Sequence, residues 1–162
     1  MKVPHKDRWN ATASSGDPRL AVDDRYATTW TSKPAKKSWL KIDLGKATML
    51  AGLEVYWGRE APVVYGFKSS LDGKRWTHLC RTGHGEGGQD VFAFPPVKAR
   101  FVRWTCDDPQ AEREKEIVEI NFYGLFCLFF FILLLVRFFG FLTGFLDLYF
   151  ITLRFERRFC LF

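Results

Sequence analysis

The feature that most constrains the fold is a strict alternation of apolar and polar residues that starts just after a basic linker. Leu40, Ile42 and Leu44 point to one side of this segment, whereas Lys41 and Asp43 point to the other. A period of two residues is typical of a β-strand that has one face in a core and one face in solvent. The sequence therefore predicts an antiparallel sheet with one buried side.

Short segments of the same kind recur at roughly ten-residue spacing as far as residue 124, and turn residues separate them. Asp72 and Gly73 form a hairpin turn of the Asp-Gly type, and Pro95 and Pro96 are expected to end a strand. No segment in this part shows convincing helical periodicity. We expect an all-β sandwich of about eight antiparallel strands, at 9–13, 39–45, 49–57, 63–69, 76–80, 91–94, 101–106 and 118–123.

The loop that precedes the first alternating strand is rich in oxygen ligands. It runs from Leu20 to Trp30 and contains Asp23, Asp24 and Thr28. Carboxylate, hydroxyl and backbone carbonyl oxygens are the ligands that Ca²⁺ prefers. The same residues are also typical of a plain surface turn between two strands, and from spacing alone both interpretations stay open.

Several motifs in this chain occur in the order of a known family. They are Ala11–Ser15, then Ala21, Asp23, Thr28 and Trp30, then Trp39–Gly45, Tyr65–Trp76, Ala99–Arg103 and Ile117–Gly124. In these motifs residues 8–124 resemble the coagulation factor V/VIII type C (discoidin) domains and the related family 32 carbohydrate-binding modules, which share a galactose-binding-like fold. The resemblance implies a jelly-roll arrangement of two packed sheets.

The resemblance also implies a structural Ca²⁺ site. Its ligands would be backbone oxygens of Leu20, Arg25 and Val118 and side-chain oxygens of Asp23, Thr28 and Glu119. Such an ion would fasten the loop to the last strand. The alternative is that Asp23 and Glu119 only accept hydrogen bonds from backbone amides. This chain has Asp24-Arg25-Tyr26 where the family often has Gly-Asn-Pro, which strains the turn if it needs a positive φ.

A ligand site is implied at one end of the sandwich. Arg59 stands where many of these domains carry an arginine, and its guanidinium can donate two hydrogen bonds to neighbouring sugar hydroxyls. Glu60 can accept another hydrogen bond, and Trp57 or Tyr26 can stack on a sugar ring, although each aromatic residue fits a core equally well. His84 lies in a glycine-rich loop that either reaches a ligand or is simply mobile.

The function implied is that of a binding module. Sugar-binding members often have a histidine where this chain has Thr31, which weakens a galactose assignment. No motif of a serine hydrolase, a zinc protease or a phosphate-binding loop occurs, so we expect no enzymatic activity. We expect a non-catalytic carbohydrate-binding module from a secreted polysaccharide-acting enzyme. The alternative is a discoidin-like adhesion module that binds protein or phospholipid.

Charge and cysteine content add little to this picture. The formal net charge is +6, and Lys33, Lys36 and Lys37 are the one tight basic cluster, which is too sparse for nucleic-acid binding. Cys80 and Cys106 each end a predicted strand and either pair or remain buried thiols. The amino terminus has no signal-peptide pattern, whereas the family is mostly extracellular or periplasmic. We therefore expect a fragment of a longer secreted protein.

The composition changes at Gly124. Residues 125–162 hold 12 of the 17 Phe and none of the Trp or Pro, so we divide the chain into a 1–124 domain and a 125–162 tail. The apolar run is long enough to cross a bilayer, but Arg137 interrupts it near the middle. Three interpretations remain: a membrane anchor over about 125–153, a product of a reading-frame error or fusion, or an amphipathic or packed helix.

Overall fold

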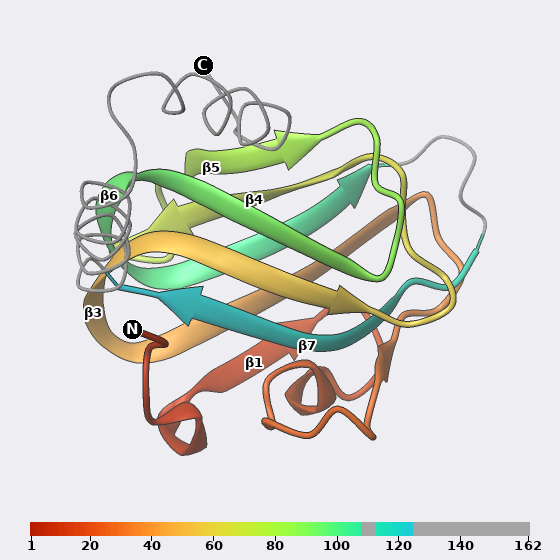
Figure 1. Ribbon diagram of the computed structural model, residues 1–162, viewed down its shortest axis with the longest axis horizontal. Helices are drawn as coiled ribbons and strands as arrows, with labels where there is room; N and C mark the ends of the chain where they lie inside the picture. The colour runs from red at the N-terminus through yellow and green to blue at the C-terminus, as the bar shows by residue number, and fades with distance from the viewer. Residues whose placement is uncertain (108–112, 125–162) are drawn as a thin grey trace, which may run out of the picture.

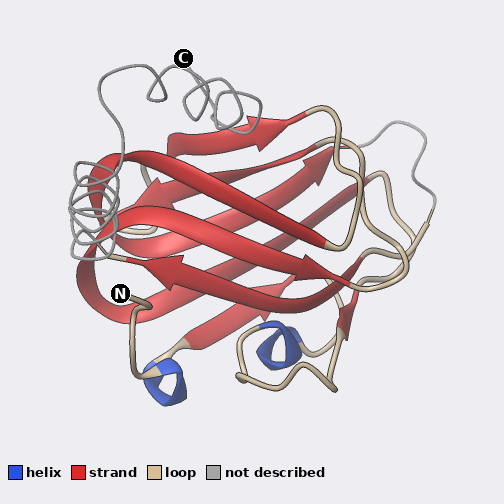
Figure 2. Cartoon of the chain, viewed as in Figure 1, coloured by secondary structure: helices blue, strands red, loops and turns tan. Residues whose placement is uncertain are grey.

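The computed structural model describes residues 1–107 and 113–124. Within them the chain forms strands joined by loops and two short 3-10 helices (Figure 2). The 3-10 helices are η1 (Lys6–Arg8) and η2 (Pro18–Ala21). The strands are β1 (Asn10–Ala13), β2 (Trp30–Thr31), β3 (Lys37–Trp57), β4 (Tyr65–Ser70), β5 (Thr77–Thr82), β6 (Gln89–Asp107) and β7 (Glu116–Tyr123).

The strands form two facing layers that share β3 and β6. Every pairing is antiparallel, and the strand order is β2-β7-β3-β6-β4-β5, with β1 added beside β3. The first half of β3 pairs with β1 and with the second half of β6, while its second half pairs with β7 and with the first half of β6. Both long strands curve round at one end of the domain and return in the other layer (Figure 1). The predicted all-β antiparallel sandwich is confirmed.

The bends in β3 and β6 correct two predicted strand boundaries. The sequence predicts a turn at 46–48 and a stop at Pro95 and Pro96, but each long strand is continuous through these positions. Regular pairing lapses between Asp43 and Thr48, and again between Leu50 and Gly52 opposite β6 residues 94–96. Extra residues in a bulge bend the strand and form no ladder hydrogen bond, so prolines without an N–H group are accommodated there. The predicted breaks are the corners of the sandwich.

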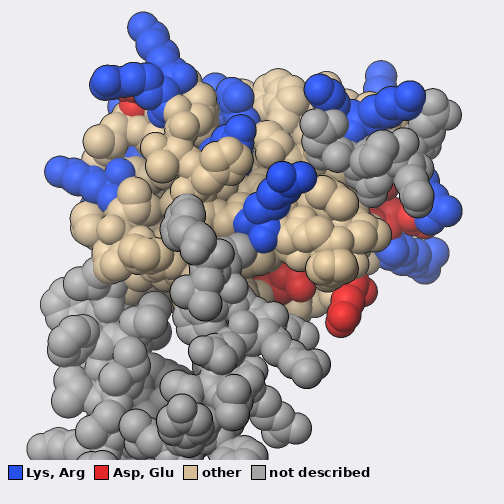
Figure 3. Space-filling model, turned by 90° about the horizontal axis from the view of Figure 1, so that it is seen from above, with Lys and Arg blue, Asp and Glu red and all other residues tan. Residues whose placement is uncertain are grey.

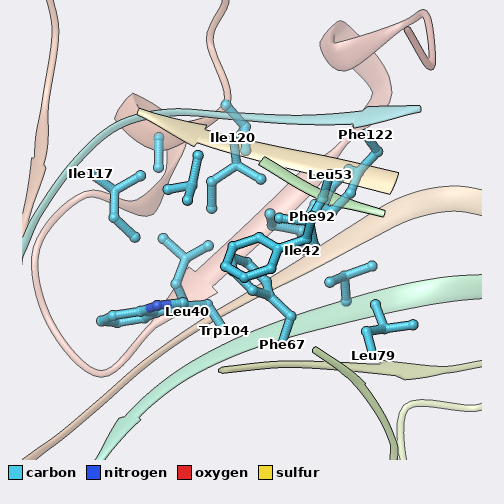
Figure 4. Close-up of a cluster of buried hydrophobic side chains, with 14 of the residues drawn as sticks. Leu40, Ile42, Leu53, Phe67, Leu79, Phe92, Trp104, Ile117, Ile120 and Phe122 are labelled. Atoms are coloured by element: carbon cyan, nitrogen blue, oxygen red, sulfur yellow. The ribbon is translucent and has the colours of Figure 1, made fainter. Parts of the chain in front are cut away.

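The core lies between the two layers and is rich in aromatic rings. The indoles of Trp30 and Trp104 are 0% and 1% exposed, and their rings meet edge to face at 5.7 Å between centroids. Figure 4 shows inward-facing side chains from both layers meeting there, from Leu40, Ile42, Leu53, Phe67, Leu79, Phe92, Trp104, Ile117, Ile120 and Phe122. The alternation that the sequence displays at Leu40 and Ile42 therefore corresponds to burial against the opposite layer.

Two predictions outside the candidate site concern the cysteines and the 125–162 tail. Cys80 and Cys106 are both buried, and no disulfide joins these two residues in the described structure. No helix of residues 1–107 and 113–124 is long and apolar enough to cross a membrane. The three interpretations of the 125–162 tail, including the membrane anchor, lie outside the described residues.

Candidate functional site

The loop of residues 20–30, which we call the cation loop, has more oxygen acceptors than hydrogen-bond donors to satisfy them. The Asp23 carboxylate accepts a hydrogen bond from the Arg25 amide at 2.9 Å. The Thr28 hydroxyl lies 2.8 and 3.0 Å from the two carboxylate oxygens of Asp23 and 2.8 Å from the Arg25 carbonyl. Because one hydroxyl donates a single proton, at least one of these oxygens is left with capacity for a cation.

The turn after Asp23 has a positive φ at Asp24, the position where the family often has a glycine. Asp24 has a φ of +59°, a region where a residue with a side chain is uncommon. Aspartate is among the residues that tolerate this conformation. Asp24 therefore replaces the glycine that the family often has without breaking the turn.

Glu119 is fully buried on the outer face of β7, beneath the cation loop. One carboxylate oxygen receives hydrogen bonds from the Lys6 ammonium and from the Ile120 amide, and the other has no partner in the described structure. Burial raises the pKa of Glu119; Lys6 opposes this shift, and the negative charges of Asp24 and Asp23 add to it. Asp23 and Glu119, which are 96 residues apart, are thus close enough to interact electrostatically.

The other predicted ligands lie on three separate elements around this point. Leu20 lies in η2, Arg25 follows Asp24 in the loop, and Val118 precedes Glu119 in β7. In the described ranges no three His, Cys, Asp or Glu side chains gather into a metal cluster. A cation here would therefore depend on backbone oxygens as well as carboxylates.

Lys6 belongs to this site although nothing in the sequence predicted it. Its side chain is 4% exposed, and its ammonium contacts Glu119, Asn121 at 2.8 Å and Asp24 at 3.1 Å. Lysine is rarely buried unless it is paired. Lys6 comes from η1, at the other end of the sequence from Glu119 and Asn121, and no local pattern reveals this contact.

A second polar cluster on the same face surrounds Glu54 of β3. The buried Glu54 carboxylate accepts hydrogen bonds from Tyr123 at 2.7 Å, Asn121 at 3.1 Å, Tyr56 at 3.0 Å and the amide of Gln89. Burial alone would raise the pKa of Glu54, but these four hydrogen bonds outweigh burial and lower it. Burial and the same carboxylate raise the pKa of Tyr56 to about 12. The alternation of Glu54 with Leu53 and Val55 is the signal in the sequence that it faces outward.

Tyr26 extends this face with an exposed aromatic ring. The side chain is 55% exposed, and its ring meets that of Tyr56 edge to face at 4.9 Å. The side-chain amide of Asn121 donates to the Tyr26 hydroxyl at 3.4 Å.

Arg59 and Glu60 lie at the end of the sandwich, in a loop that backbone hydrogen bonds hold in place. The Glu116 side chain accepts from the Arg59 amide at 2.7 Å, and the Glu116 amide donates to the Glu60 carbonyl at 2.9 Å. A Cβ at Gly58 would lie 2.6 Å from the Cβ of Glu116, so a larger residue there would force the Glu116 side chain to shift. The side chains of Arg59 and Glu60 are exposed.

His84 belongs to a loop that lies against this one. The Gly85 amide donates to the Val63 carbonyl at 2.9 Å, which joins the 83–88 loop to the loop that carries Arg59. The His84 side chain is exposed. The structure therefore brings the loops of Arg59, Glu60 and His84 together.

Trp57, by contrast, belongs to the core and is not on the surface. Its side chain is 5% exposed and packs on Tyr65 and Trp104 at 4.8 and 6.1 Å between ring centroids. Its indole N–H donates to Asp90 at 2.7 Å, and the Tyr65 hydroxyl donates to the same oxygen at 2.5 Å. Of the two roles that the sequence left open for Trp57, the structure supports packing.

Comparison with known proteins places these features in a family. The family model described as F5/8 type C domain matches residues 7–120. Chitosan-binding module 2 of a chitosanase/glucanase from Paenibacillus sp. IK-5, solved with chitotriose, is 25% identical with a TM-score of 0.68, and the alignment covers 72% of this chain and 97% of that module. Chitosan-binding module 1 of the same enzyme is also 25% identical with a TM-score of 0.68, over 72% of this chain and 96% of that one.

A more distant structure has the same fold. The family 32 carbohydrate-binding module of NanJ from C. perfringens, solved with galactose, is 19% identical with a TM-score of 0.65, over 76% of this chain and 98% of that one. No curated protein sequence matches the chain. Because the family model covers most of the chain, and its range includes the cation loop and the loop of Arg59, the chain belongs to the F5/8 type C domain family.

Proposed function

We propose that this chain is a non-catalytic carbohydrate-binding module. The observation that carries this proposal is its likeness to chitosan-binding modules, which spans nearly the whole length of those modules. Such modules need a rigid fold with exposed polar and aromatic groups at one place. The adjoining loops of Arg59, Glu60 and His84 supply polar groups of this kind, and Tyr26 supplies an exposed ring on the outer face beside Tyr56.

The loop that carries Arg59 and Glu60 determines the binding chemistry. Glu116 fixes the backbone at Arg59, so little loop entropy is lost when the guanidinium engages a ligand. That guanidinium donates hydrogen bonds to neighbouring hydroxyls of a sugar, and Glu60 accepts a hydrogen bond from another hydroxyl or from an amine. The ring of Tyr26 packs on the apolar face of a sugar.

We also propose that the cation loop takes a structural Ca²⁺. The surplus acceptors around Thr28, the unpartnered oxygen of Glu119 and the nearby charge of Asp23 fit a hard cation. The ligands would be those implied by the family: Leu20, Asp23, Arg25, Thr28, Val118 and Glu119. The ion would fasten the loop to β7 and so support Tyr26, which follows Arg25.

The biological setting is proposed from the same likeness. The similar modules come from a chitosanase/glucanase, so we infer that this domain was part of a secreted polysaccharide-acting enzyme, outside the cell or in the periplasm. In that setting the module would hold its parent enzyme near an insoluble substrate.

Retention of the full chain on immobilised ligands tests this function. We expect retention on chitosan or on a galactose-bearing resin, and elution by the matching free sugar. Retention on phospholipid vesicles with none on any glycan would favour the adhesion module instead and overturn the proposal.

A further inference from the structure

A row of cationic side chains crosses the outer face of the layer that contains β1, β5 and the second half of β6. Lys41 of β3 is the direct partner of Arg103 in β6, Arg103 is the partner of Lys68 in β4, and Lys68 is the partner of His78 in β5. Adjacent strands lie about 4.8 Å apart. We call Lys41, Arg103 and Lys68 the cationic row.

The cationic row has little acid beside it: Asp43 attracts Lys41 electrostatically without pairing with it. None of its three members forms an ion pair with a carboxylate among the described residues. Asp43, the acid nearest in sequence to Lys41, is held by the Arg100 guanidinium through two bonds of 2.9 Å. Like charges directly opposite one another destabilise a sheet, so Lys41 and Lys68 beside Arg103 weaken the pairing of these strands.

Two tryptophans hold the central guanidinium of the row. Arg103 lies over the ring of Trp76 at 4.3 Å and over that of Trp39 at 5.7 Å. Its Nε is buried and has no hydrogen-bond partner in the described structure. Stacking of this kind fixes the plane of a guanidinium and leaves its fork ready for a planar carboxylate.

The molecule as a whole carries an excess of basic residues, with a formal net charge of +6. Figure 3 shows more Lys and Arg than Asp and Glu side chains on the side seen from above. The face of the cationic row is separated by the core from the outer face that carries Glu54 and Tyr26, because the second half of β3 lies in the opposite layer.

We propose that the cationic row is a second binding site, which takes a linear polysaccharide bearing one carboxylate on each sugar. One sugar residue of an extended polysaccharide is about as long as the spacing between neighbouring strands, so successive carboxylates can meet successive cations. A single-stranded nucleic acid fits less well, because stacked bases need open aromatic faces and Arg103 covers a face of both tryptophans. This site is independent of the proposed ligand site at Arg59.

The test compares polygalacturonate with the same polymer after methyl esterification, which removes its charge. Binding of the full chain is measured by affinity electrophoresis and by titration calorimetry. We expect polygalacturonate to bind and the esterified polymer to bind at least tenfold more weakly, because each charged hydrogen bond contributes roughly a factor of ten. Equal binding of the two polymers would overturn the proposal.

Variants locate the site. The double variant K41Q/K68Q should lose about tenfold or more in affinity, whereas K46Q/K98Q, which removes the same charge from exposed positions at the corner of the sandwich, should change affinity less than about threefold. Arg103→Lys should weaken binding although it keeps the charge, because it loses the planar fork. Equal losses in the two double variants would show general charge attraction and overturn the proposal.

Two further measurements distinguish glycan binding from a structural role of the lysines and from nucleic-acid binding. K41Q/K68Q should unfold at the same temperature as wild type or higher, because it relieves repulsion; a marked decrease would assign the lysines to structure and overturn the proposal. Tighter binding of an oligo-dT strand than of polygalacturonate at the same ionic strength would identify a nucleic-acid site and overturn the glycan assignment.

Discussion

Replacing Lys6 by Met should destabilise the domain strongly at neutral pH. The substitution keeps the length of the side chain and removes the ammonium that lies against Glu119. Glu119 is 0% exposed, so its carboxylate would remain buried without a counter-charge. Removal of one partner from a buried pair costs about 3–5 kcal/mol, a large share of the roughly 5–15 kcal/mol by which domains are stable.

The cost should also depend on pH with a definite sign. Burial already raises the pKa of Glu119, and Lys6 opposes that shift. Without Lys6 the pKa of Glu119 in the folded state rises further above its unfolded value of about 4.3. The folded state then binds the proton more tightly, so stability falls as pH rises from the unfolded pKa through the folded pKa. The deficit should be small near pH 4 and largest above pH 7.

Urea unfolding of the full chain between pH 4 and 8 measures this deficit. Lys98→Met at an exposed position is the matched control and should stay within about 0.5 kcal/mol of wild type. Adding Glu119→Gln to Lys6→Met should recover part of the loss at pH 7, because it removes the unpaired charge. A cost below about 1 kcal/mol at pH 7, with no change across the pH range, would show that Lys6 does not stabilise the buried charge of Glu119.

Three other predictions concern the cation loop, the core and the Glu54 network. Ca²⁺ should raise the melting temperature of wild type, and calorimetry should detect one site that is lost in Asp23→Ala; no binding by the folded protein would refute the cation loop. Asp90→Ala should lower the free energy of unfolding in urea by about 2–4 kcal/mol, because it leaves the indole of Trp57 and the hydroxyl of Tyr65 unpaired in the core. Asp90→Asn should lower it less, and equal losses in the two variants would contradict this. The hydrogen bonds of Glu54 lower its pKa, so it stabilises the fold above its unfolded pKa of about 4.3 and loses that contribution as pH falls through its folded pKa. Glu54→Gln should therefore flatten the fall in unfolding free energy at acid pH. An unchanged dependence on pH would count against a stabilising role of the hydrogen bonds around Glu54.

The sequence predicts the layers of this fold better than its corners. Alternation at Leu40 and Ile42 shows which face of β3 is buried, because side-chain direction in a strand has a period of two. The same alternation cannot distinguish a turn from a corner, since Pro95 and Pro96 interrupt a strand ladder in either case. For that reason two predicted strand pairs merge into β3 and β6, and the two-residue β2 was not predicted.

The candidate site likewise has residues that local motifs predict and contacts that they do not. Motif order predicts candidate sites at the loop of Asp23 and at Arg59, because these positions belong to local patterns. Lys6 was missed because its partner Glu119 lies 113 residues away, and the core role of Trp57 depends on an acceptor 33 residues away in β6. Contacts between distant segments depend on topology, which a local pattern does not encode.

The proposed function depends on glycan binding by Arg59, at one end of the sandwich. Calorimetric titration of the full chain with chitotriose, and then with galactose, tests it directly when wild type is compared with Arg59→Ala and with Arg75→Ala. Arg75 is an exposed arginine in the β4–β5 turn that pairs with Asp72, and it serves as the matched control. We predict saturable binding of at least one of these sugars by wild type and by Arg75→Ala, and a loss of about tenfold or more in Arg59→Ala. Folded protein that binds neither sugar, or an Arg59→Ala variant that binds as tightly as wild type, would contradict the claim.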